Sequence, residues 1–497
     1  MLIVALFSIL TRLLGFLFRI YLSRELGAEM LGIYQVAFSI FMVLTILVSS
    51  GLPLTVSKRT ARYQVLNDKK SQYGIVSSSL VIGLSISVVI CLVFVIFQNF
   101  IANLFTDARA MTILLTLLPA VVFSAVYSSF RGSLWGTKNY FFVSLAEFVE
   151  QVARIVFFVL LLECLLPNAN GGVVAGLSMT FGCMVSMVFV AIVYFADKRK
   201  LTSPRGYYKE IWHSALPITG VRTATSLIQP LIAVLFPFML VLSGHTSEQA
   251  MSLYGIVMGM AFPLLFLPST IVGAMSFTLI PDLSVSIAKN DTLDVAQKIK
   301  SNLFFAMLVS VLFVPFYLGA GTEICEFLFG NSLAGVYLAR SAFVMLPLGL
   351  SNITSSILNT FNLEVKSFVN NIVGGALLIV CVVCLSGIMS VDALILGFFL
   401  CMTVTTVLNL LMLKRHTHYK LNIFRPMLLM ILFVIPSAML CKFVCGIVTT
   451  YLGLFWGIAF GGIVSILAFL VLCWAFRLID IISLFCKFLP KKFKKHA

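Results

Sequence analysis

The segment "TRLLGFLFRI", residues 11–20, lies inside an almost wholly apolar run that extends from Met1 to Ser23. About 20 apolar residues are enough to cross a bilayer, so this run predicts a membrane-spanning helix. Two arginines interrupt it, Arg12 and Arg19, and an arginine at the centre of such a helix costs about 2.5–3.5 kcal/mol on insertion scales. This cost predicts that Arg12, which lies mid-span, faces an anion or water rather than lipid.

The composition extends this reading to the whole chain of 497 residues, which is 61% hydrophobic and only 10% charged, with a mean hydropathy of +1.09. Soluble domains contain about 25% charged residues, so we expect a polytopic membrane protein. The net charge of +16 comes from basic residues in short loops and one tail, which indicates no nucleic-acid partner. We expect no metal and no cofactor, because most of the cysteines lie in apolar runs without zinc-ligand spacing.

Breaks at polar residues and at Gly or Pro clusters divide the chain into spans. They lie near residues 2–23, 31–54, 75–103, 110–134, 140–165, 171–195, 212–242, 251–280, 301–320, 334–361, 367–388, 392–413, 424–447 and 453–479. We therefore expect an all-α polytopic membrane protein with about 14 transmembrane helices.

Weak internal repeats predict that the first twelve spans are two copies of one unit. "YSSFRGSLWGTKNYF" (127–141) and "TSSILNTFNLEVKSF" (354–368) both connect the fourth span of a half to its fifth, and Pro53 recurs as Pro281. The expected organisation is an N-terminal six-helix bundle (1–196), a parallel C-terminal six-helix bundle (207–414), helices 13 and 14 (421–479) and a basic cytoplasmic tail (480–497). Parallel repeats place a transport site near the midplane between the halves.

Lysine and arginine are concentrated in every second loop, including the loop expected to contain Arg131 and Lys138, whereas the opposite loops contain Arg24 and Arg109. Cytoplasmic loops carry such an excess. Both termini are therefore expected on the cytoplasmic side of the membrane.

Four segments carry a family resemblance: "TRLLGFLFRIYLSRELGAEMLGIYQVAFSIF", "SSGLPLTVSKRTARY", "GTKNYFFVSLAEFVEQVARI" and "YGIVMGMAFPLLFLPSTIVGAMSFTLIPDLSVSIAK". They resemble the polysaccharide-transporter branch of the multidrug/oligosaccharidyl-lipid/polysaccharide exporter superfamily, and within it the lipid-linked oligosaccharide flippases. The resemblance implies transport of an undecaprenyl-pyrophosphate-linked saccharide, either lipid II or a polysaccharide repeat unit, from the inner to the outer leaflet of a bacterial plasma membrane. It also implies that Arg12 and Arg19, which match the family's first-span arginines, bind this substrate.

A third arginine, Arg222, lies in a span that contains Pro217, Pro230 and Pro237 and that should pair with the first span across the halves. We expect Arg222 to line the same cavity and to bind the substrate's pyrophosphate together with Arg12 and Arg19, because the arginine fork suits phosphate. The alternatives are that Arg19 snorkels to the interface and that the span around Arg222 is a proline-kinked packing helix.

The fifth span carries Glu147, Glu150 and Arg154 along one stripe. Glu150 and Arg154 are an i, i+4 pair. One interpretation is purely structural: an internal ion pair that holds the N-terminal bundle together. The functional interpretation is that Glu147 balances an arginine of the cavity or takes up a coupling ion, Na+ or H+. Polar stripes on the fourth and tenth spans fit helix–helix hydrogen bonding as well as sugar binding, and Arg340 is expected to snorkel.

Two other functions compete with the flippase. A multidrug or organic-cation exporter of the same superfamily would need unpaired carboxylates, and residues 2–23 and 211–244 contain none. A membrane enzyme would need catalytic carboxylates or histidines near an interface, but the histidines lie in loops, at span ends or in the tail, without a catalytic motif in a suitable context. We therefore expect a transporter and not an enzyme.

Overall fold

The structure is a computed structural model that describes residues 2–165, 170–289, 291–417 and 424–478. It divides into two compact units, residues 1–259 with 386–388, and residues 260–385 with 389–497. Each unit is described by itself. This grouping by contact does not test the halves 1–196 and 207–414, which stay a prediction, and the tail 480–497 lies outside the described residues.

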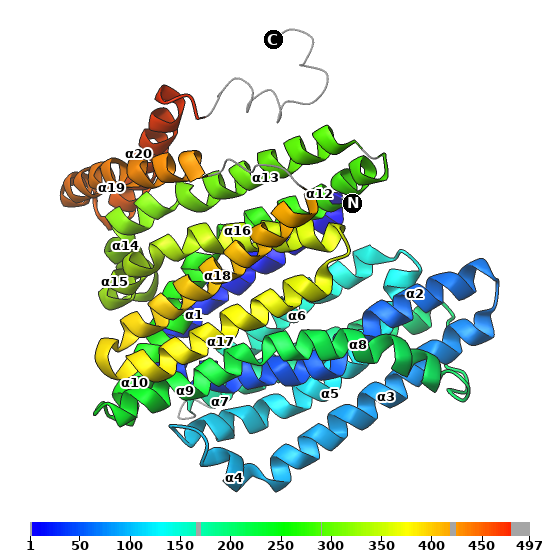
Figure 1. The fold of residues 1–497 in the computed structure, drawn as a ribbon. Coiled ribbons are helices and arrows are strands. Elements are labelled where there is room, and N and C mark those ends of the chain that lie inside the picture. Colours follow the sequence, from blue (N-terminus) through cyan, green and yellow to red (C-terminus); the bar gives the residue numbers. More distant parts are fainter. Residues whose placement is uncertain (1, 166–169, 290, 418–423, 479–497) are drawn as a thin grey trace. The chain divides into compact units, whose positions relative to one another are not determined.

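The described chain is helical (Figure 1). In the first unit the helices are α1 (Leu2–Ser49), α2 (Leu52–Val65), α3 (Lys69–Ile96), α4 (Gln98–Ala102), α5 (Arg109–Gly136), α6 (Tyr140–Leu160), the π-helix η1 (Leu161–Leu165), α7 (Gly171–Ala196), α8 (Tyr208–Ser226), α9 (Ile228–Leu242) and α10 (Ser247–Tyr254). The π-helix η2 (Gly255–Ala261) follows.

In the second unit they are α11 (Phe262–Phe266), α12 (Ser269–Ala288), α13 (Thr292–Leu312), α14 (Val314–Phe329), α15 (Ser332–Ser341), the 3-10 helix η3 (Ala342–Val344), α16 (Met345–Thr360), α17 (Glu364–Met389), α18 (Val391–Thr417), α19 (Phe424–Leu452) and α20 (Leu454–Ala475).

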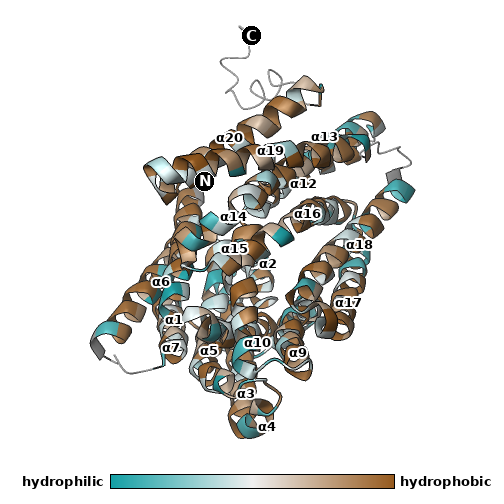
Figure 2. Ribbon diagram, turned by 90° about the vertical axis from the view of Figure 1, so that its left-hand side faces the viewer, coloured by the Kyte–Doolittle hydropathy of each residue, from teal (hydrophilic) through white to brown (hydrophobic). Residues whose placement is uncertain are grey.

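The predicted fold class is confirmed: the described residues contain 13 helical segments long and apolar enough to cross a membrane. The first of these, Leu6–Val65, contains two of the predicted spans, and the predicted span 251–280 is divided into two. The charged helix α6, predicted as the fifth span, is not among them. These differences account for the gap between thirteen segments and the predicted fourteen. Figure 2 shows that the helices are coloured mostly as hydrophobic, as a bilayer requires.

One residue joins the first two predicted spans. The sequence predicts a connection between residues 23 and 31, but the structure keeps this region helical except at Gly27, which has φ 70° and ψ 175°. Arg19 and Tyr34, on either side of Gly27, are close enough to interact electrostatically. In a continuous straight helix they would be about 22 Å apart along the axis. The chain therefore reverses direction at Gly27, where only glycine adopts this backbone without strain.

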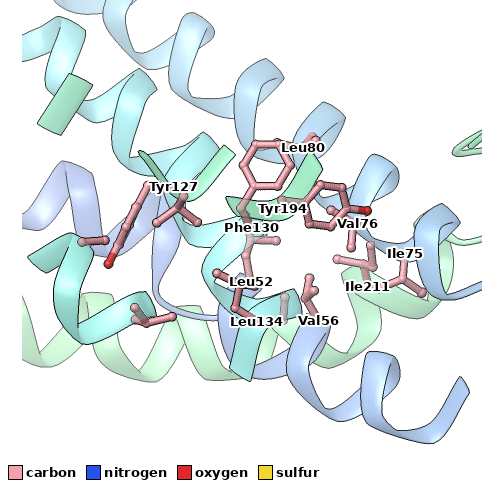
Figure 3. Packing of buried hydrophobic residues seen from close by; sticks show 14 residues of the cluster. Leu52, Val56, Ile75, Val76, Leu80, Tyr127, Phe130, Leu134, Tyr194 and Ile211 are labelled. Carbon is pink, nitrogen blue, oxygen red and sulfur yellow. The ribbon is translucent and has the colours of Figure 1, made fainter. Parts of the chain in front are cut away.

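Close helix packing holds the first unit together. Gly132 and Gly136, four residues apart on α5, face α2, and a Cβ atom on Gly132 would lie 2.8 Å from the Pro53 carbonyl oxygen. Such a small-xxx-small pair lets two backbones approach in a membrane. Beside this contact, buried apolar side chains of α2, α3, α5, α6, α7 and α8 form one cluster, shown in Figure 3.

The segment 197–207, between α7 and α8, is bonded along its length to the ends of α3 and α5. Arg199, whose side chain is 6% exposed, donates to the hydroxyls of Ser133 and Thr137. The remaining bonds join Thr202 to Ser77 and to the Lys70 carbonyl, Ser78 to the Pro204 carbonyl, and Tyr207 to Ser71. The segment is thus an ordered part of this end of the first unit.

Proline divides several predicted spans. The span 212–242 is broken at Leu227, between α8 and α9. Pro230 has no N–H, so the carbonyl of Ser226, where α8 ends, loses its helical partner. In the second unit α13 ends at Leu312 and α14 begins at Val314, just before Pro315. The seventh span is thus interrupted beside Pro230, whereas Pro217 lies within α8 and Pro237 within α9.

Two polar contacts in the second unit answer questions that the sequence left open. The Asn409 amide on α18 donates to the hydroxyls of Thr354 and Ser355 on α16 at 3.1 Å each. This part of the polar stripe on the tenth span therefore makes helix–helix hydrogen bonds. Arg340 pairs with Asp392 at 2.7 Å, so it has a protein partner, and its snorkelling to the interface stays a prediction.

Candidate functional site

All six candidate residues lie in the first unit, on α1, α6 and α8. Helix α1 runs parallel to α6 along its first part, because Phe7 packs against Phe148 and Phe18 against Phe158, each with ring centroids 5.4 Å apart. Arg12 lies between these contacts. This packing places the first arginine of the opening segment at the level of the charged stripe on α6.

Arg12 is exposed and Arg19 is half-buried. Within the described residues neither forms an ion pair with a carboxylate. Arg12 is near enough to Glu147 to interact with it electrostatically, while Arg19 interacts with Tyr34. Both guanidinium groups are thus left with donors to spare.

The predicted pair on α6 is confirmed as an ion pair. A guanidinium nitrogen of Arg154 lies 3.0 Å from a carboxylate oxygen of Glu150, and both side chains are largely buried, at 16% and 21% exposed. The other carboxylate oxygen of Glu150 accepts a hydrogen bond from Ser186 on α7 at 2.8 Å. Gly182, one turn earlier on α7, allows this approach, because a Cβ there would lie 3.0 Å from the Glu150 carbonyl oxygen.

Glu147 has a partner that the sequence analysis missed. Arg131 on α5 lies 3.6 Å from the Glu147 carboxylate, and its guanidinium is 4.7 Å from the centroid of the Trp135 ring. The expectation that Arg131 lies in a cytoplasmic loop is wrong. Because the glycines of α5 pack against α2, the helix continues through "FRGSLWG" to Gly136 and carries Arg131 with it. Arg131 belongs to the polar stripe on the fourth span, and this stripe was the feature of the sequence that could have placed Arg131 on the helix.

Arg222 is exposed on α8 and, like Arg12, has no ion pair with a carboxylate in the described part of the chain. Helix α8 packs against α1, and the α1 residues beside it, Leu47 and Val48, lie in the second predicted span. The expected pairing with the first span stays a prediction. The two helices run antiparallel beyond Gly27, because Glu210 pairs with Arg59 at 2.6 Å and a Cβ on Gly51 would touch Thr219. By this register Arg222 lies at the level of residues 47 and 48.

The chain reversal at Gly27 places Arg12 at the level of residue 42 and Arg19 at the level of residue 35. With a rise of 1.5 Å per residue, Arg222, Arg12 and Arg19 follow one another at steps of about 8–10 Å in depth. We call these three residues the arginine ladder. Measured along the helix axes, the candidate arginines therefore lie at three different levels rather than at one.

The charge balance follows from these pairings. Arg131 matches Glu147, and Arg154 matches Glu150. The three arginines of the ladder therefore carry positive charge without a paired carboxylate among the described residues. Buried donors without a hydrogen-bond partner in the structure lie beside the pairs, namely Gln151 Nε2, Arg131 Nε and Arg154 Nε. Such groups are usually satisfied by water or by a ligand.

A bundle of membrane-spanning helices with intramembrane charges and broken helices is the architecture of a transporter. Solved structures agree on the fold. Lipid II flippase MurJ in an inward closed conformation superposes with a TM-score of 0.70, covering 96% of this chain and 99% of that one at 15% identity. An inward-facing multidrug resistance MATE family transporter of the MOP superfamily gives 0.69, covering 82% and 94% at 16% identity.

The sequence comparison identifies the family. The profile described as "Polysaccharide biosynthesis protein" matches residues 1–287, and the chain belongs to that family. Stage V sporulation protein B of Bacillus subtilis (strain 168) is 25% identical over 379 residues, covering 74% of this chain and 73% of that protein. Lipid II flippase MurJ of the same organism is 23% identical over 466 residues, covering 85% and 84%. The chain is a multi-pass membrane protein of this family, which confirms the family resemblance seen in the sequence, and it shares the fold of the MurJ and MATE structures.

Proposed function

We propose that this protein is an alternating-access flippase that moves an undecaprenyl-pyrophosphate-linked saccharide from the inner to the outer leaflet of the bacterial plasma membrane. The observation that carries the proposal is the arginine ladder, whose three cations have no paired carboxylate in the described residues. The similarity to the lipid II flippase of Bacillus subtilis supports a lipid-linked substrate. Both termini are then cytoplasmic, as the distribution of basic loops predicts.

The ladder suits a charged headgroup that must cross the bilayer. A pyrophosphate costs many kcal/mol to move into hydrocarbon without a compensating charge. Arginine binds phosphate oxygens through two parallel N–H donors and stays charged at any accessible pH. The arginines lie about 8–10 Å apart in level along the helix axes, so in this proposal the headgroup meets them in succession as it crosses.

In this proposal the two ion pairs of α6, Glu147 with Arg131 and Glu150 with Arg154, keep the glutamates from neutralising the positive charge of the arginine ladder. Glu147 lies between Arg131, its ion-pair partner, and Arg12, with which it interacts electrostatically. A proton or Na+ arriving at Glu147 would cancel its negative charge and leave Arg12 fully available to the substrate. Glu147 is therefore the proposed coupling residue, and Glu150 with Arg154 holds α6 and α7 in register.

The alternative, a multidrug or organic-cation exporter, shares the fold of the MATE transporter. It is the weaker candidate, because an organic cation needs a free carboxylate and both glutamates of α6 are paired with arginine. Release of one pair during transport would be required before either could bind a cation.

The test is a leaflet-access assay in proteoliposomes with a radiolabelled undecaprenyl-pyrophosphate-linked disaccharide. Arg12→Ala and Arg222→Ala should each abolish translocation while expression and thermal stability persist. Arg340→Ala, which removes an arginine that is already paired, is the matched control and should retain transport. Normal rates in both ladder variants would overturn the proposal, and uptake of an organic cation by the unmodified protein would favour the alternative.

A further inference from the structure

An apolar groove of about 440 Å³ lies on the first unit between α3 and α8. Its walls are Ile82, Ile86, Val89 and Ile90 of α3, and Ile211, Trp212, Ala215, Leu216 and Thr219 of α8, while the end of α1 and Leu52 close its base. A volume of this size is within the range of about 300–1,000 Å³ found for ligand pockets. The charged residues discussed above do not line it, so its walls have the chemistry that suits a hydrocarbon chain.

The α8 wall of the groove follows one stripe of the helix. Lining residues recur at positions 211, 212, 215, 216 and 219, which is the spacing of one helical face. The next members of this stripe are Arg222 and Thr223. Arg222 is exposed, and it lies three residues, or about 4.5 Å along the axis, beyond Thr219.

The α3 wall reaches the same level. Gly74 of α3 faces Tyr207, since a Cβ there would lie 2.4 Å from the Tyr207 ring. Since both α3 and α8 begin at this end, they run parallel here (Figure 1). Because Gly74 faces Tyr207, we take each α3 residue to be level with the α8 residue whose number is 133 higher. Val89 and Ile90, the last α3 residues that line the groove, are then level with Arg222 and Thr223. The α8 wall ends at Thr219, one helical turn before Arg222, and the α3 wall reaches the level of Arg222.

Resting on the flippase function proposed above, we propose that this groove holds the polyprenyl chain of the substrate while Arg222 binds its phosphate. The apolar walls match a hydrocarbon chain, and the unpaired guanidinium at the end matches an anion. The groove and Arg222 together recognise one class of ligand, a phosphate-bearing lipid with a long chain.

An ordinary bilayer phospholipid does not fit this arrangement. Arg222 is 14 residues after Tyr208, the first residue of α8, so it lies about 21 Å along the axis from that end. The hydrocarbon core is about 30 Å thick, and phospholipid phosphates remain at its edges. A phosphate at Arg222 has therefore left the interface, which is what a lipid in transit must do.

The experiment uses the full chain in nanodiscs of phosphatidylglycerol and phosphatidylcholine with a photoreactive undecaprenyl phosphate that carries no sugar. The unmodified protein should crosslink at α3 and α8. Thr219→Trp, which fills the groove, and Arg222→Gln, which removes the cation, should each lower crosslinking about tenfold. Val221→Trp is the control, because Val221 is exposed on α8 but does not line the groove, and it should crosslink normally.

Ser85→Leu, on the opposite wall, repeats the filling test in case Thr219→Trp does not fold. The inference is overturned if a groove-filling variant, Thr219→Trp or Ser85→Leu, folds and still crosslinks as strongly as the unmodified protein. It is also overturned if excess phosphatidylglycerol competes with the probe as well as unlabelled undecaprenyl phosphate does. The probe has no sugar and needs no translocation, so its result is separate from the transport assay. If the probe crosslinks but the sugar-linked lipid is not transported, the lipid site in the groove is supported and the proposed flippase function is overturned. If the sugar-linked lipid is transported but the probe does not crosslink, the flippase function is supported and the groove site is overturned.

Discussion

The pair between Arg131 and Glu147 gives the sharpest prediction, because in the proposed function it controls whether Glu147 competes with the substrate for Arg12. We predict that Arg131→Gln lowers the affinity for an undecaprenyl-pyrophosphate lipid, although Arg131 itself need not touch that lipid. Without Arg131, the nearest cation to the Glu147 carboxylate is Arg12, which already interacts with it. The carboxylate would then attract Arg12 and oppose an approaching anion.

The size of the effect follows from the geometry. At 3.6 Å and an effective dielectric constant of about 20, the gross attraction between the two charges is about 5 kcal/mol. The side chains are 26% and 41% exposed, and exposed pairs retain only about 0.2–1 kcal/mol. A partly exposed pair therefore contributes about 1–2 kcal/mol, which corresponds to about a 5–30-fold change in affinity.

The assay is a double-mutant cycle on substrate affinity in nanodiscs. Arg131→Gln should weaken binding about 5–30-fold, and the double variant Arg131→Gln/Glu147→Gln should return it to within about threefold of the unmodified protein. Arg340→Gln, which also breaks an arginine–carboxylate pair, should leave affinity unchanged. If the double variant binds as poorly as Arg131→Gln alone, Glu147 does not compete for Arg12 and the reasoning fails.

Two further predictions concern stability. Gly32→Ala should lower the melting temperature in detergent by many degrees, because its Cβ would lie 2.0 Å from a backbone oxygen. Gly27→Ala meets open space but must adopt φ 70° and ψ 175°, a conformation almost restricted to glycine, and should cost about 1–3 kcal/mol; a larger loss for Gly27→Ala than for Gly32→Ala would contradict this ranking. Hydrogen bonds from Ser71 hold the pKa of Asp68 below its ordinary value of 3.8, so the cap it gives α3 is present above that pH and is lost as the pH falls through the folded-state pKa. The protection of the first-turn amides of α3 against exchange, relative to the intrinsic rate at each pH, should therefore fall as the pH drops below about 4 in the unmodified protein and stay constant in Asp68→Ala.

The helices could be predicted because each needs only its own residues. Apolar length decides whether a segment spans the bilayer, and proline decides where it breaks, so α7, α17 and α18 begin and end within about four residues of the predicted bounds. The connection near Gly27 could not be predicted, because a reversal at one residue depends on how the flanking helices pack. The extent of α13 and α14 beyond the predicted 301–320 likewise includes polar turns that tertiary contacts stabilise.

The same distinction holds for the candidate site. The pair of Glu150 with Arg154 is local, one helical turn apart, and the sequence was sufficient to find it. The pair of Glu147 with Arg131 joins two helices, and no spacing rule connects positions 131 and 147. Its absence from the sequence analysis left Glu147 without an assigned partner, and only the packing of α5 against α6 supplies one.

The bonded segment between α7 and α8 has a mechanical consequence. A free linker of eleven residues could extend to about 36–40 Å and would permit large movements of α8. Residues 197–207 cannot extend in this way while Arg199, Thr202 and Tyr207 keep their hydrogen bonds. Any pivot of α8 is therefore at its own first turn, so a flexible tag inserted at residue 203 should release α8 from the segment that anchors it.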